Sequence, residues 1–404
     1  MNISRRTLLG SALAAPVIAT MAPGLNVAFG AETGTPRDTL IVIFQRGAAD
    51  WLQMLAPSGD ADYIKARPNI RVMANAGIGL GTMKGTDIYL SASAPDLKTL
   101  YDAGQLAFVH AAGMPTNSRS HFDCQDMMEK AAVETESKQT AGWLARHLAS
   151  TDVAPPILAT LSASLSAPVS LQGNSQAIAI GNSTTFNVSG GDANVNLLRN
   201  LNTGTSRFEA KARETLNAVS SIQLGLRTIN TSQSNAAGYT GGALSTALRS
   251  LAQMIKMNVG VTTATVDFGS WDMHNSMVTE FATRTTEFSR AIAAFWKDMA
   301  DYQSRITIVT MTEFGRRLQE NASLGTDHGS ASGMLVLGGN VNGGKLYGTW
   351  PGLAAGTLTR GDLAVTTDYR QVLSEILVTR HAEKNLAAVF PTVKYAPLGL
   401  IKTA

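Results

Sequence analysis

The chain has 404 residues, a formal net charge of +3 and 44% hydrophobic residues. This length and apolar content suit one large domain with a sizeable core, and so small a net charge argues against nucleic acid or an anionic membrane as a partner. Cys124 is the only cysteine, which excludes an internal disulfide.

Residues 1–30 have the form of a signal peptide. The segment Ser4-Arg5-Arg6-Thr7-Leu8-Leu9 is followed by a weakly apolar stretch and by the small residues around Ala28 and Gly30. This pattern predicts a twin-arginine signal, cleavage near Gly30 and a periplasmic or secreted protein. The alternative is a cytoplasmic arm with two chance arginines. No later apolar stretch reaches about 18 residues, so no transmembrane segment is predicted in the mature chain.

The first predicted elements of the mature chain are two strands and a helix. Residues 39–44 form a continuous apolar run, as in a buried strand, and a second strand is predicted at 106–110. A polar turn at 114–120 leads into a predicted helix over 121–132. Residues 162–205 are rich in Ser, Asn, Gly and Thr without a helical period, which predicts an insertion of short strands and loops, a candidate lid or cap.

The remaining sequence alternates between the two kinds of element. It predicts helices at 207–229, 243–257, 276–302 and 368–378, strands at 262–268, 305–310 and 333–337, and a loop at 231–242. This alternation predicts an α/β domain over residues 31–404, with a mostly parallel central sheet and helices on both faces. Ligands of such sheets bind beyond the carboxyl ends of the strands.

Acidic and imidazole side chains follow several of these predicted strands. The set comprises Asp50, His121, Asp272, His274, Glu313, Asp327 and His328. Because they belong to five separate segments, we expect them to converge at one edge of the sheet. Mixed carboxylate and imidazole ligands suit Zn²⁺ or Mn²⁺. The alternative is that the aspartates cap helices and the histidines form hydrogen bonds in loops.

Two serines precede the predicted helix that starts at His121. A helix N-terminus favours an anion, so Ser120 or Ser118 is a candidate nucleophile toward a phosphate or sulfate ester, with Arg119 steadying the charge. Ser120 also suits the N-cap position, with Asp123 completing a near capping box, and the two roles are compatible. A metal-free serine hydrolase is less favoured because no Gly-x-Ser-x-Gly elbow is present.

Two arginines, Arg46 and Arg316, also follow predicted strands. Either can bind an anion, and either can equally form a surface salt bridge.

Six motifs together resemble the exported family called domain of unknown function 1501, over nearly the whole mature chain. They are Phe44–Asp50, Ser118–Asp123, Trp271–His274, Thr312–Arg317, Gly325–Gly329 and Thr366–Arg370. That family is grouped with the alkaline phosphatase and sulfatase superfamily. The resemblance therefore implies a two-metal hydrolase fold.

The superfamily pattern assigns roles to three of the motifs. Asp50 resembles the metal-binding Asp that ends the first strand, although it lies four residues late. Ser120, or Ser118, takes the place of the nucleophile that opens a helix. Asp272-Met273-His274 resembles the superfamily's Asp-x-x-x-His ligand pair, but in this sequence the pair is two residues shorter.

The later motifs depart from that pattern. Thr326-Asp327-His328-Gly329 resembles the Thr-x-Asp-His-Gly signature, but no predicted strand immediately precedes it. The strand that ends before Glu313 matches this signature better. Glu313 would then replace its Asp, and Phe314 stands where its ligand His belongs. His328 then resembles the last ligand His. Since Phe cannot bind a metal, one of the two sites is expected to be lost, moved to Asp327 or His121, or adapted to another ion.

The sequence therefore supports two main hypotheses. The first is an exported hydrolase of phosphate or sulfate esters, small or polymeric, with Ser120 as nucleophile, His121 as ligand or proton donor, and a divalent metal (Zn, Mn or Ca). The second is a non-catalytic envelope binding or assembly protein on the same fold, which Phe314 favours. The sequence indicates no oligomeric state.

Overall fold

The computed structural model describes residues 37–133, 139–151 and 158–402. The predicted signal peptide, residues 1–30, lies outside these ranges. Among the described helices, none combines the length and the apolar character that crossing a membrane requires.

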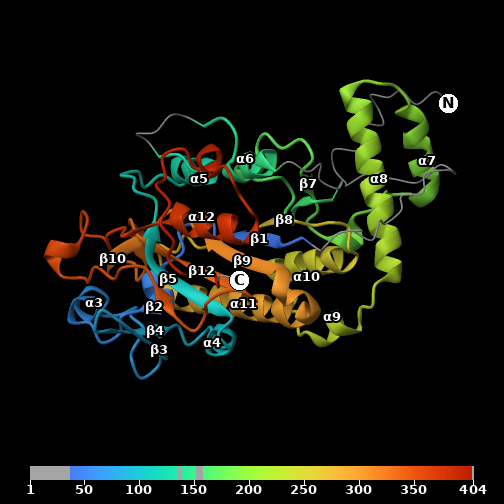
Figure 1. The fold of residues 1–404 in the computed structure, drawn as a ribbon. Helices are drawn as coiled ribbons and strands as arrows, with labels where there is room; N and C mark the ends of the chain where they lie inside the picture. The colour runs from blue at the N-terminus through green and yellow to red at the C-terminus, as the bar shows by residue number, and fades with distance from the viewer. Residues whose placement is uncertain (1–36, 134–138, 152–157, 403–404) are drawn as a thin grey trace.

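Within the described residues, nine strands form one central sheet in the order β13-β5-β12-β9-β1-β8-β6-β7, with β14 beside β5 (Figure 1). The strands are β1 (Thr39–Phe44), β5 (Leu106–Gly113), β6 (Thr160–Ser162), β7 (Ile178–Ala179), β8 (Thr263–Asp267), β9 (Ile306–Met311), β12 (Ser332–Gly338), β13 (Leu346–Tyr347) and β14 (Thr367–Asp368). The strands predicted at 39–44, 106–110, 262–268, 305–310 and 333–337 are all present.

The sheet is mostly parallel. β1 lies between β8 and β9 and runs parallel to both, with Leu40 opposite Thr263 on one side and Thr307 on the other. Only β12 runs against its neighbours, since it pairs antiparallel with both β9 and β5. Because β12 is antiparallel to both of these neighbours, β5 and β9 run in the same direction. The carboxyl ends of β1, β5, β8 and β9 therefore lie at one edge of the sheet.

Helices cover both faces of the sheet, as predicted (Figure 1). Alternate residues of β1 enter different cores: Ile41 and Ile43 pack on one face, and Leu40 and Val42 on the other. The first face is covered by α4 (Pro95–Asp102), α10 (Ala243–Lys256) and α11 (Met277–Asp298), and the second by α5 (His121–Lys130), α6 (Trp143–Ser150) and α12 (Tyr369–Arg380). This arrangement confirms the α/β fold class.

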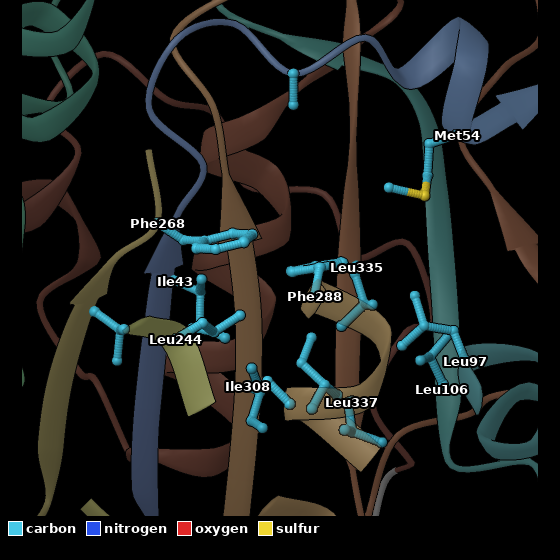
Figure 2. Close-up of a cluster of buried hydrophobic side chains, with 14 of the residues drawn as sticks. Ile43, Met54, Leu97, Leu106, Leu244, Phe268, Phe288, Ile308, Leu335 and Leu337 are labelled. Atoms are coloured by element: carbon cyan, nitrogen blue, oxygen red, sulfur yellow. The ribbon is translucent and has the colours of Figure 1, made fainter. Parts of the chain in front are cut away.

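The larger core lies under α11 and α10. Phe288 of α11 is fully buried and stacks on Phe268, with ring centroids 6.1 Å apart (Figure 2). Leu244 of α10 and Leu335 of β12 are also fully buried in this cluster (Figure 2). Burying each such side chain contributes about 1.5–3 kcal/mol, so this layer stabilises the packing of the sheet against its helices.

Residues 162–205 are not all loops and short strands, because they contain the helix α7 (Gly191–Leu201). β7 also extends the edge of the central sheet beside β6. α7 lies beside the long helix α8 (Arg207–Thr228), and Val195 packs on Leu216 and Val219 (Figure 1). The Gly and Asn content hides the amphipathic period of α7, which its contact with α8 stabilises. That this segment is a lid or cap stays a prediction.

The smaller elements surround the sheet. The segment predicted as a loop at 231–242 contains a short helix, α9 (Ser232–Ala236). A second sheet is built from β2 (Leu55–Ala56), β4 (Thr86–Leu90) and β3 (Ile78–Met83), and a hairpin from β10 (Arg316–Glu320) and β11 (Thr326–His328). Other short α-helices of the described residues are α2 (Trp51–Met54), α3 (Ala61–Ala66) and α13 (Leu386–Val389), and short 3-10 helices lie at Val169–Leu171, Ser183–Thr185, Ala300–Arg305 and Ala355–Thr357.

Candidate metal centre

Four loops and the β10–β11 hairpin meet at the carboxyl edge of the sheet. The loop after β1 contacts the loop after β8, where the backbone N–H of Trp271 bonds to the carbonyl of Arg46 over 3.3 Å. Gly47 has φ +109°, and a Cβ there would lie 2.7 Å from the backbone nitrogen of Asp272. Only glycine permits this approach, which brings Asp272 over the end of β1.

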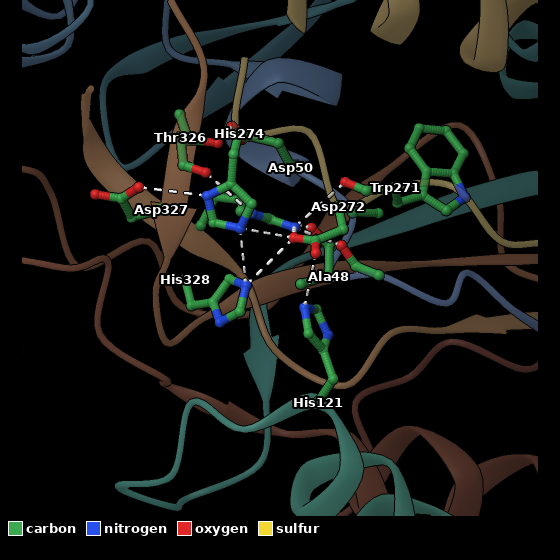
Figure 3. A network of polar contacts seen from close by, with 12 residues as sticks. Ala48, Asp50, His121, Trp271, Asp272, His274, Thr326, Asp327 and His328 are labelled. Atoms are coloured by element: carbon green, nitrogen blue, oxygen red, sulfur yellow. Dashed lines mark hydrogen bonds and ion pairs between the residues drawn. The ribbon is translucent and has the colours of Figure 1, made fainter. Parts of the chain in front are cut away.

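Three ligand-type side chains converge above this edge: His121, Asp272 and His328, whose ligand atoms all lie within 4.8 Å of one another (Figure 3). The Nε2 atom of His121 is 3.3 Å from Oδ2 of Asp272, and the Nε2 atom of His328 is 3.2 Å from Oδ1. The Asp272 side chain is 45% exposed, so an ion or a small ligand can reach it from solvent.

His121 is oriented by the buried carboxylate of Glu313. Oε1 of Glu313 accepts hydrogen bonds from Nδ1 of His121, Nε2 of Gln125 and the backbone N–H of Gly47, each 2.8 Å long. These bonds hold the pKa of Glu313 below its usual value despite burial, which acts to raise it. The bond to Glu313 in turn raises the pKa of His121, against the effect of burial. Glu313 therefore supports the His121 ring at Nδ1, the ring nitrogen that does not face Asp272.

With Nδ1 of His121 turned to Glu313, its Nε2 faces Asp272. That Nε2 atom is buried and has no hydrogen-bond partner, because the nearby Asp272 oxygen is not aligned to accept a hydrogen bond. A metal-binding histidine usually donates one ring N–H to a carboxylate and directs its other ring nitrogen at the ion. His121 has this arrangement. The residues present thus fit a divalent ion.

His328 has the matching arrangement. Its Nδ1 lies 2.8 Å from the backbone carbonyl of Arg119. Because a carbonyl oxygen only accepts, Nδ1 must carry the proton, and the neutral ring then presents its Nε2 lone pair to Asp272. Burial lowers the pKa of His328, which favours the neutral form.

Phe314 holds the two imidazoles in place. Its buried ring lies 5.0 Å from the His121 ring and 4.9 Å from the His328 ring, measured between centroids. The residue that stands where the superfamily pattern has a ligand His therefore packs against two histidines.

Asp272 is held in its ionised form by Arg316. Burial raises the pKa of Asp272, but the hydrogen bond and charge of Arg316, with the nearby histidines, bring it to about 2. Nη2 of Arg316 is 2.6 Å from Oδ1 of Asp272. The surface salt bridge considered for Arg316 is wrong, because this side chain is only 1% exposed. Arg46 does form salt bridges, with Asp267 and Glu129.

His274 and Asp327 lie at the outer side of the cluster (Figure 3). Nε2 of His274 is 2.9 Å from Oδ1 of Asp272 and 3.1 Å from Nε2 of His328. Its Nδ1 is 3.4 Å from Oδ1 of Asp327, whose carboxylate is 55% exposed. The Asp327-His328 pair lies within β11, which pairs with the preceding β10, although no strand was predicted before it.

Asp50 lies below the cluster and has other partners. Its Oδ1 caps α2 by accepting from the backbone N–H of Gln53, and its Oδ2 is 2.9 Å from Nη1 of the buried Arg67. The hydroxyl of Thr326 also donates to Oδ2 over 3.1 Å. Both carboxylate oxygens of Asp50 are therefore engaged away from the three converging side chains.

Ser120 and Arg119 precede α5, as predicted. The Ser120 hydroxyl accepts from the backbone N–H of Asp123 over 3.4 Å, so it is the N-cap of α5. The Arg119 guanidinium pairs with the fully buried Asp362. The role of the Arg119 carbonyl toward His328 and the role of Asp362 were missed, since no local pattern marks a backbone acceptor or a contact 243 residues away.

Comparisons with known proteins add a family and distant structural likenesses. No curated protein sequence is significantly similar to this chain. Among solved structures, the chain is similar to the C-terminal periplasmic domain of EcEptC from Escherichia coli, in complex with Zn, at 7% identity and a TM-score of 0.30, over 76% of this chain and 74% of that one. It is also similar to the lipoteichoic acid synthase LtaP from Listeria monocytogenes, at 8% identity and a TM-score of 0.32, over 82% and 75%.

Identities and TM-scores this low transfer neither a reaction nor a substrate. The family model described as "Protein of unknown function (DUF1501)" matches residues 109–375, which is more than half of the chain and includes His121, Asp272, Glu313 and His328. The chain therefore belongs to the DUF1501 family.

Proposed function

We propose that this protein is an exported enzyme that hydrolyses phosphate or sulfate esters and depends on a divalent metal ion held by His121, Asp272 and His328. The observation that carries the proposal is the orientation of the two imidazoles. Each has its Nδ1 engaged by a fixed acceptor and its Nε2 directed at the same carboxylate. An acceptor that holds one ring nitrogen and so orients the other toward the ion is usual for histidines that bind a metal.

The donor set favours particular ions. Two imidazole nitrogens and one carboxylate suit Zn²⁺ or Mn²⁺, whereas Ca²⁺ prefers six to eight oxygen ligands. Three protein ligands leave a coordination position for substrate or water, which is typical of catalytic sites. An ion bound there would polarise the ester and lower the pKa of a bound water.

Ser120 is the proposed nucleophile. It lies at the N-terminus of α5, next to His121, where backbone N–H groups favour an anionic ester. The guanidinium of Arg119 is paired with Asp362, so charge on the substrate is left to the helix N-terminus and the ion. Ser118, whose hydroxyl accepts from the Ser120 backbone N–H over 3.3 Å, provides a matched control.

The second candidate is a non-catalytic envelope binding or assembly protein on the same fold. Two observations favour it: Phe314 stands where the superfamily pattern has a ligand, and Arg119 has its guanidinium committed to Asp362. In that case the protein binds metal and a glycan or other envelope polymer but does not hydrolyse esters.

The test compares metal content with hydrolysis of aryl phosphate and aryl sulfate in the purified protein. We expect bound Zn²⁺ or Mn²⁺ and ester hydrolysis. His328→Ala should lose both by at least about 100-fold, and Ser120→Ala should lose hydrolysis alone while Ser118→Ala keeps it. A folded wild-type protein that binds no metal would refute the proposal. Metal binding without hydrolysis across an ester panel would select the second candidate.

A further inference from the structure

Arg316 is a buried cation whose donors all have acceptors. A guanidinium has five N–H groups, and those of Arg316 reach acceptors at 2.6 to 3.4 Å. The acceptors are the backbone carbonyls of Gly47, Ala48, Trp271 and Thr326, Oδ1 of Asp272 and Nε2 of His274. Its side chain is 1% exposed. Arg316 is therefore a fixed charge and is not available to bind a substrate.

This fixed charge contacts the candidate metal centre through Asp272 and His274. Arg316 touches Oδ1 of Asp272 over 2.6 Å and Nε2 of His274 over 3.4 Å. Oδ1 is shared, because it also lies 3.2 Å from Nε2 of His328, whereas the other carboxylate oxygen, Oδ2, faces His121. A second ion on the outer side would have to use Oδ1 of Asp272 and Nε2 of His274. Both atoms are already neighbours of the positively charged guanidinium of Arg316.

His274 is tied to carboxylates on both sides. Its Nε2 lies 2.9 Å from Asp272 and its Nδ1 lies 3.4 Å from Asp327. The Nδ1 atoms of His121 and His328 are held by contacts of 2.8 Å, whereas the Nδ1 contact of His274 is 3.4 Å long and is made to an exposed carboxylate, which fixes this ring less firmly. Its contacts are those of a bridge between Asp272 and the β10–β11 hairpin, and they do not prepare it as a ligand.

From these contacts we infer that the site takes one divalent ion, bound by His121, Asp272 and His328, and that Arg316 supplies the positive charge where a second ion would bind. This inference rests on the proposed metal site and adds its stoichiometry. His274 and Asp327 then lie beside the ion without binding it, although the sequence predicts both as ligands.

Calorimetric titration of metal-free protein with Zn²⁺ and with Mn²⁺, checked by elemental analysis, tests the stoichiometry. We expect one ion per chain. His274→Ala should keep one ion with an affinity within about threefold of the wild type, whereas His328→Ala should weaken binding by at least about 100-fold. The His274 side chain is 37% exposed, and circular dichroism and thermal unfolding confirm that each variant is folded.

The outcomes separate the two proposals. Two ions per chain, or equal losses in His274→Ala and His328→Ala, would overturn the single-ion inference and leave a metal-dependent function intact. No ion bound by folded wild-type protein would overturn the proposed function itself.

Discussion

At the scale of single residues, the candidate centre is defined by partners that fix the direction of each imidazole. Glu313 does this for His121 and the Arg119 carbonyl does it for His328. Because each acceptor holds Nδ1–H, the ring is fixed in orientation before any ion arrives, which reduces the cost of ordering the ligands.

The role of Glu313 can be tested by Glu313→Gln. The amide cannot provide the charged acceptor that orders His121, so we expect metal affinity to fall about 10–100-fold, as is usual for partners of ligand histidines. Glu214→Gln, on the exposed face of α8, is the matched control. Calorimetry gives both affinities, and an unchanged affinity in Glu313→Gln would show that Glu313 does not support the site.

The sequence identifies the residue types of the site but not their partners. Asp50 illustrates the limit: its place after β1 predicts a ligand, yet Arg67, 17 positions along the chain, takes its carboxylate in a buried salt bridge. Nothing in the local pattern announces that contact. Arg316 shows the same effect, since only folding reveals that it is buried against Asp272.

At the scale of elements, strong periodicity made the long helices and buried strands predictable. On the predicted apolar face of α11, Phe281, Phe288, Ile292 and Phe295 are all buried. The antiparallel direction of β12 and the β10–β11 hairpin were not predictable, because strand pairing depends on contacts between distant segments. α7 was missed because its composition resembles a loop and its stability comes from packing on α8.

A buried histidine links β5 to β2 and makes stability depend on pH. His110 in β5 is fully buried, lies 2.9 Å from the carbonyl of Leu55 through Nε2, and accepts from the backbone N–H of Ala111 through Nδ1. Both ring nitrogens are matched only in the neutral form. Burial lowers its pKa to about 4, whereas the unfolded chain protonates near 6.5.

Since the folded pKa is depressed, the stabilisation by neutral His110 is complete above pH 6.5 and is lost as the pH falls from 6.5 toward 4. We therefore expect the free energy of unfolding to drop less between pH 7 and 4.5 in His110→Gln than in the wild type, by about 2–3 kcal/mol. Urea unfolding at both pH values measures the difference. Identical drops in the two proteins would contradict this assignment.

At the scale of the whole molecule, the topology brings distant segments together. β1, β5, β8 and β9 end at one edge, and the segments that follow β5, β8 and β9 carry His121, at the start of α5, Asp272 and Glu313. The rule that ligands bind beyond the carboxyl ends of parallel strands predicted this convergence. His328 reaches the same place from the β10–β11 hairpin, which explains how a residue outside the parallel strands completes the centre.

The most direct test is anomalous X-ray diffraction at the zinc edge from crystals of the protein saturated with Zn²⁺. We expect a single strong anomalous peak at bonding distance, about 2.0–2.2 Å, from Nε2 of His121, Nε2 of His328 and a carboxylate oxygen of Asp272. A saturated crystal with no peak between these three side chains would contradict the proposed metal site.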